Sequence, residues 1–164
     1  MVDFASRLAE GLTAHEAAVR EANEISQVLR ELDEQVRQAT GEAVRIGVET
    51  FRIKKPKQHN SIFAVVVADF SPPEYEEFKG LGAKTSEKPN NPVLLAKWDT
   101  NSRGYPVSLH YSDIGAKAYD KATLEKILGD LLASPETGRS IQGVIDQAAR
   151  AKAKADEQAK SVDP

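Results

Sequence analysis

The longest unbroken apolar run of the chain lies near its middle, at residues 62–68. It is rich in valine and has a polar residue at each end, Ser61 and Asp69. A short β-branched run of this kind predicts a strand that is buried on both faces. We therefore expect residues 61–70 to form a central strand, and a helix is the alternative.

The first forty residues carry a helical pattern. From Leu8 onward the apolar and small residues are spaced alternately by three and four, as in the seam of a coiled coil, and the seam is strong only from Ala22 onward. Thr40 and Gly41 are a natural helix stop. A helix this long predicts pairing with a second helix of the same or another chain; the alternative is one long helix lying on its own sheet. The expected oligomer seam consists of Ala22, Ile25, Leu29, Leu32 and Val36.

Four other segments predict strands. Residues 43–55 begin with apolar even-numbered positions and change phase at Phe51, so we expect a bulge near Glu49 and Thr50. Residues 93–100 and 105–111 flank a turn rich in Asn, Asp and Gly, which is typical of a hairpin. A short strand at residues 116–119 follows. With the central strand, these segments predict an antiparallel meander of about five strands.

The region after the central strand predicts a short helix and a loop. Ser71 to Glu74 match a capping box with proline at the first helical position, so we expect a helix that ends at about Lys79. Residues 80–92 are rich in Gly, Pro and Asn and show no apolar period. They predict a surface loop.

The C-terminal third predicts two helices. Asp120 is an N-cap, and Ser134-Pro135 ends the first helix and begins the second. Beyond Ala149 the alternating Ala, Lys and Arg predict an exposed helix, followed by a disordered end at residues 161–164. The expected class is therefore α+β, organised as an N-terminal helix at 1–40, a core at 41–148 and a tail at 149–164. The first C-terminal helix has a core-facing stripe made of Leu124, Ile127, Leu128, Leu131 and Leu132.

The composition of the chain excludes several kinds of functional site. The chain has no cysteine, so disulfides, thiolate metal sites and cysteine nucleophiles are excluded. The first residues lack a secretory signal pattern, and no apolar run approaches the roughly 20 residues of a membrane helix. We therefore expect a cytoplasmic protein. The net charge is −3, but residues 41–119 hold nine acids and eleven bases, a mild basic excess.

Motifs of catalysis and cofactor binding are missing from the sequence. It contains no phosphate-binding glycine loop and no nucleophile elbow. His15, His59 and His110 are far apart and have no metal-ligand spacing. We expect no enzyme, no cofactor and no metal.

Binding is the expected function. The first interpretation is a non-enzymatic homo-oligomer, of the adaptor, chaperone or inhibitor type, that binds a protein partner. Aromatic and cationic residues on the second hairpin form the candidate surface, centred on Trp98, Tyr105 and His110, although Trp98 can equally be core.

A nucleic-acid-binding accessory protein is the alternative interpretation. The hairpin tip after residue 51 is basic and can contact phosphates, or it can simply protect the sheet edge. The candidate phosphate contacts are Arg52, Lys54, Lys55, Lys57 and Arg103.

Overall fold

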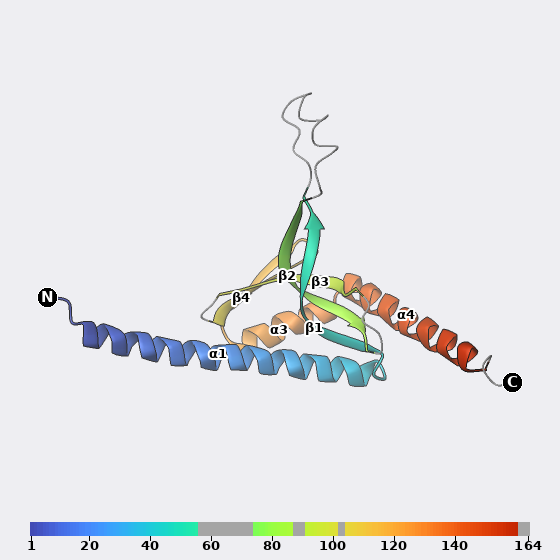
Figure 1. Ribbon diagram of the computed structural model, residues 1–164, viewed down its shortest axis with the longest axis horizontal. Helices are drawn as coiled ribbons and strands as arrows, with labels where there is room; N and C mark the ends of the chain where they lie inside the picture. The colour runs from blue at the N-terminus through green and yellow to red at the C-terminus, as the bar shows by residue number, and fades with distance from the viewer. Residues whose placement is uncertain (56–73, 87–90, 102–103, 161–164) are drawn as a thin grey trace, which may run out of the picture.

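The computed structural model describes residues 1–55, 74–86, 91–101 and 104–160 (Figure 1). Within these ranges the chain forms three helices and a five-stranded antiparallel sheet. The predicted class is confirmed: an α+β fold with a meander sheet, a long N-terminal helix and two C-terminal helices. The expected central strand at 61–70 and the expected disordered end at 161–164 lie outside the described residues.

Every strand of the sheet pairs with its neighbour in the sequence. The sheet order is β1-β2-β3-β4-β5, and all four pairings are antiparallel. The described strands therefore lie in the sheet in the order in which they follow one another in the sequence. The strands are β1 (Val44–Lys54), β2 (Tyr75–Thr85), β3 (Val93–Asn101), β4 (Gly104–Tyr111) and β5 (Ile114–Ala118).

The helices begin at the caps that the sequence contains. Helix α1 (Phe4–Ala39) begins after Asp3, whose carboxylate accepts hydrogen bonds from the backbone N–H groups of Ala5 and Ser6. Helix α3 (Lys121–Leu132) begins after Asp120, which accepts from the Thr123 N–H at 2.7 Å. These bonds satisfy N–H groups that a helix leaves unpaired at its start. Helix α4 (Pro135–Lys160) follows Ser134, as predicted.

One face of the sheet carries the core, and the helices cover that face (Figure 1). Because strand side chains alternate between faces, the register assigns the cross-strand pairs Ile46 with Ala83 and Trp98 with Leu109 to the covered side. All four of these residues are buried. Val28 of α1, Leu124 and Leu131 of α3 and Val144 of α4 complete the core from the helix layer.

The second half of α1 lies on its own sheet, the arrangement that the sequence left open as the alternative. Ile25 and Val36 are buried in the core, and Leu29 and Leu32 pack against it. The Asp33 carboxylate accepts from the backbone N–H of Ile46 at 2.8 Å, which covers part of the β1 edge. The surface that α1 leaves for another chain is therefore mostly N-terminal to Ile25.

The prediction of a helix up to Lys79 and a loop from Gly80 is wrong for residues 75–85. Residues 75–85 form β2, which pairs with β1 in continuous register from Lys54–Tyr75 to Val44–Thr85. The local capping signal is outweighed by this long pairing, in which Phe78 stacks on Phe51.

The bulge predicted near Glu49 and Thr50 is also absent from the β1–β2 register. The irregularity lies instead between Leu81 and Gly82, where β2 pairs with β3. The change of apolar phase in β1 has another cause. Val44 and Ile46 face the helices, whereas Phe51 lies on the opposite face of the sheet.

Candidate interaction site

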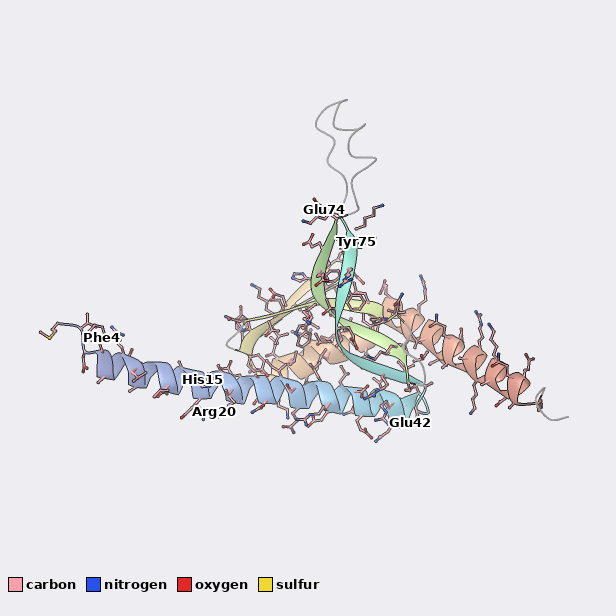
Figure 2. All side chains as sticks on the ribbon, in the orientation of Figure 1. Phe4, His15, Arg20, Glu42, Glu74 and Tyr75 are labelled. Carbon is pink, nitrogen blue, oxygen red and sulfur yellow. The ribbon has the colours of Figure 1, made fainter. Side chains whose placement is uncertain are left out.

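The first half of α1 extends beyond the sheet as a free helix, which we call the arm and define as residues 4–22 (Figures 1 and 2). Four large apolar residues of the arm are exposed: Phe4 at 79%, Leu8 at 65%, Leu12 at 57% and Val19 at 44%. At about 100° per residue they fall within about 80° of the helix circumference. A continuous apolar stripe on an exposed helix marks an interaction surface more often than it marks a solvent-facing one.

The arm is joined to the body by contacts on its other side. The backbone N–H of Tyr105 donates to the Glu21 carboxylate at 2.9 Å, and the Tyr105 hydroxyl donates to Glu24 at 3.0 Å. Burial, together with the hydrogen bond to Glu24, raises the pKa of the Tyr105 hydroxyl above its usual range, so the group stays a donor throughout the neutral pH range. By helical geometry Glu21 and Glu24 lie about 145° and 155° from the centre of the stripe. The stripe therefore faces away from the body.

A second exposed surface is the sheet face opposite the helices, which we call the open face. The rings of Phe51 and Phe78 stack there with centroids 5.7 Å apart, and the Lys97 ammonium lies 5.3 Å from the Phe78 centroid. Leu94 adds a partly exposed aliphatic side chain. An apolar patch with a cation over an aromatic ring is typical of a surface that binds another protein.

Two glycines make the open face possible. A Cβ on Gly80 would lie 2.4 Å from Leu94 Cδ1 and 2.9 Å from the Phe51 ring, and a Cβ on Gly82 would lie 2.9 Å from the same ring. Both residues are buried beneath these side chains. The missing Cβ atoms let Phe51 and Leu94 pack directly on the strand backbone.

Gly80→Ala is expected to lower the free energy of unfolding by about 1–3 kcal/mol, because the added methyl group must displace Phe51 and Leu94. Denaturant titration measures this change. Gly47→Ala is the matched control in the adjacent strand, where a Cβ meets nothing within 4 Å. Equal effects of the two substitutions would show that Phe51 does not pack over Gly80.

The structure separates the three residues of the predicted binding surface. Trp98 is core, with 4% of its surface exposed. Tyr105 is held against α1 by Glu24. His110 is exposed on the open face, directly across from Lys97 in the β3–β4 pairing. The open face thus combines His110 with Lys97, Phe78 and Phe51, of which the two phenylalanines were missed from the sequence.

The basic tip is largely neutralised where the structure describes it. Arg52 forms an ion pair with Glu77 at 2.7 Å. Across residues 52–55 and 74–77 there are three bases and three acids, on two adjacent strands. Lys54 and Lys55 are exposed, while Lys57 and Arg103 lie outside the described residues. Because phosphate binding depends on net positive charge, this balance gives no support to the nucleic-acid interpretation, which stays a prediction.

Within the described ranges we find neither a catalytic site nor a metal site. There, no group of three His, Asp or Glu side chains comes close enough to hold a metal ion. A notch between β3 and the start of α4 is lined by Lys97, His110, Ser112 and Glu136, without a nucleophile bonded to a base. None of the helices in these ranges is both long and apolar enough to cross a bilayer.

Comparison of the chain with protein-family models, with curated proteins and with solved structures gave no match. The arm and the open face are therefore the two candidate functional surfaces of the described residues.

Proposed function

We propose that this protein is a non-enzymatic interaction module, of the adaptor, chaperone or inhibitor type, that self-associates through the arm and offers the open face to a protein partner. The observation that carries this proposal is the exposed stripe of Phe4, Leu8, Leu12 and Val19 on a helix whose first half extends beyond the sheet. Such a stripe lowers its free energy by covering itself with another apolar surface.

The expected free energies of burial and of association support a weak, reversible dimer. Full burial of one Leu, Val or Phe side chain contributes about 1.5–3 kcal/mol. Two arms bring eight such side chains together, against an association cost of about 4–15 kcal/mol. Full burial of all eight would give about 12–24 kcal/mol. The real gain is smaller, because these side chains are only 44–79% exposed in the single chain and pairing covers only part of each, so we expect the dimer to dissociate on dilution.

The open face is the part left for a different partner. It lies on the side of the sheet that no described helix covers, so arm pairing does not bury it. Phe51, Phe78 and Leu94 provide apolar contact area, while Lys97 and His110 provide polar contacts at its edge. An aromatic centre with a polar margin is the usual composition of a protein-binding patch.

The double substitution Leu8→Asp and Leu12→Asp is expected to convert the dimer into a monomer. Each aspartate would place a charge in the apolar contact, where desolvation opposes pairing. Sedimentation equilibrium over a range of concentrations measures the molar mass. The fold should stay intact, because both residues are exposed and outside the core.

The matched control is Ser6→Asp with Thr13→Asp. These residues are also exposed on the arm but lie about 140–160° from the centre of the stripe, and the substitution adds the same charge. The control should associate as the unmodified chain does. An unmodified chain that stays monomeric at every concentration would overturn self-association, as would a Leu8 and Leu12 variant that keeps the dimer mass.

A further inference from the structure

We infer that two arms pair antiparallel about a two-fold axis near residue 13, an inference that rests on the self-association proposed above. The evidence lies in the sizes of the side chains along one seam of the arm, in the order Phe4, Leu8, Gly11, His15, Ala18 and Ala22. The large apolar residues are at the N-terminal end of this seam and the smallest ones are toward the body; Ala18 is half-buried and the others are exposed.

The antiparallel register matches each large residue with a small one. When residue i lies opposite residue 26 − i, Phe4 packs on Ala22 of the second copy and Leu8 packs on Ala18. His15 packs on Gly11 in the same register. Each layer then holds a similar volume, as close packing requires, and small residues let the helices approach closely.

A parallel pair would have uneven layers. Each seam residue would meet its own copy, so Leu8 would meet Leu8 and Gly11 would meet Gly11. The two His15 side chains would also face each other. Overfilled layers would alternate with empty ones, and both defects are destabilising.

The flanking positions agree with the antiparallel register. Leu12 comes beside Leu12 of the second copy, and Val19 comes beside Ala5. The arm, residues 4–22, holds three acids and two bases, so its net charge of −1 opposes pairing only weakly.

The arm also has the space that this register needs. Phe4 of one copy lies level with Ala22 of the other. Ala22 comes just before Ile25, the first residue of α1 that is buried in the core. The contacts of Glu21 and Glu24 with Tyr105 lie on the far side of the helix. Two arms can therefore pair over their full length, with the two bodies at opposite ends.

The cysteine-free chain allows a direct test by disulfide trapping. Leu8→Cys and Ala18→Cys chains are oxidised separately and as a mixture, and the products are identified by mass spectrometry. Antiparallel pairing predicts that the mixture forms a covalent heterodimer and that each variant alone links poorly. In the antiparallel register, residue 8 of one copy and residue 8 of the other are ten residues apart, which is about 15 Å along the helix axis. A disulfide needs Cα atoms about 4.4–6.8 Å apart, so these two positions cannot link.

Ala14→Cys is a second probe that removes no large side chain. It lies beside its own copy near the two-fold axis, so it is expected to link to itself in the antiparallel dimer. Rapid self-linking of Leu8→Cys without the mixed product would overturn the antiparallel register in favour of a parallel one. A dimer in which none of these cysteines link would place the contact elsewhere. A purely monomeric unmodified chain would overturn this inference and the proposed self-association together.

Discussion

Replacing Trp98 with alanine is expected to lower the free energy of unfolding by about 3–5 kcal/mol, the range for removing a large aromatic side chain from a core. Trp98 is 4% exposed, lies opposite Leu109 in the β3–β4 pairing and faces the helix layer. Its loss leaves a cavity that the neighbouring strands and helices cannot fill. Denaturant unfolding followed by far-UV circular dichroism measures the change.

His110→Ala is the matched control one strand away. His110 is exposed on the opposite face of the sheet, so its removal is expected to change the free energy of unfolding by no more than about 0.5 kcal/mol. Comparing the two variants tests which face of the β3–β4 hairpin belongs to the core. A Trp98→Ala variant as stable as the unmodified chain would mean that Trp98 belongs to a surface.

Gly104→Ala is expected to have the next largest effect, because it disturbs the joint between the sheet and α1. Gly104 has φ +102°, a conformation that costs a residue with a Cβ about 1–3 kcal/mol. An added Cβ would also lie 2.5 Å from Glu21 Cβ, which cannot move without moving α1. We expect a total loss of about 2–6 kcal/mol from these two terms. Thermal unfolding measures it.

The control for Gly104 is Gly138→Ala in α4. A Cβ there meets nothing within 4 Å, and alanine favours a helix over glycine by about 1 kcal/mol. This variant should be as stable as the unmodified chain or more stable. A Gly104→Ala protein with unchanged stability would show that the turn does not press against Glu21.

Sequence patterns were sufficient for the elements whose signals are local. Asp120 is a cap in the structure, as predicted, and the leucine stripe of α3 faces the core. The strands β3, β4 and β5 follow alternation and turn residues that lie within a few positions of each other. Local chemistry determines these elements, so a single sequence is enough to find them.

Strand β2 could not be found in the same way. Its partner residues in β1 are 21 to 41 residues away along the chain, and Ser71 to Glu74 carry a helix-start signal of their own. Gly80 and Gly82 indicate a loop in sequence. In the structure they are strand positions on which Phe51 and Leu94 pack. Such packing depends on residues brought together by folding.

The candidate site was only partly predictable for the same reason. The seam was strongest from Ala22 to Val36 because large apolar residues are densest there, yet Ile25 and Val36 are used by the core of the same chain. Which half of α1 stays exposed depends on where the sheet ends. The pattern identified a helix with an apolar face, but not the part of it left for a partner.

Amide hydrogen exchange of the arm, compared between dilute and concentrated protein, tests the central claim most directly. Exchange reports local opening, and a free helical end opens more readily than one that is packed. Self-association through the arm predicts that peptides covering residues 4–22 exchange more slowly as concentration rises, while peptides from β3 and α3 stay unchanged. Arm exchange that is the same at every concentration would contradict the claim that this surface joins two copies.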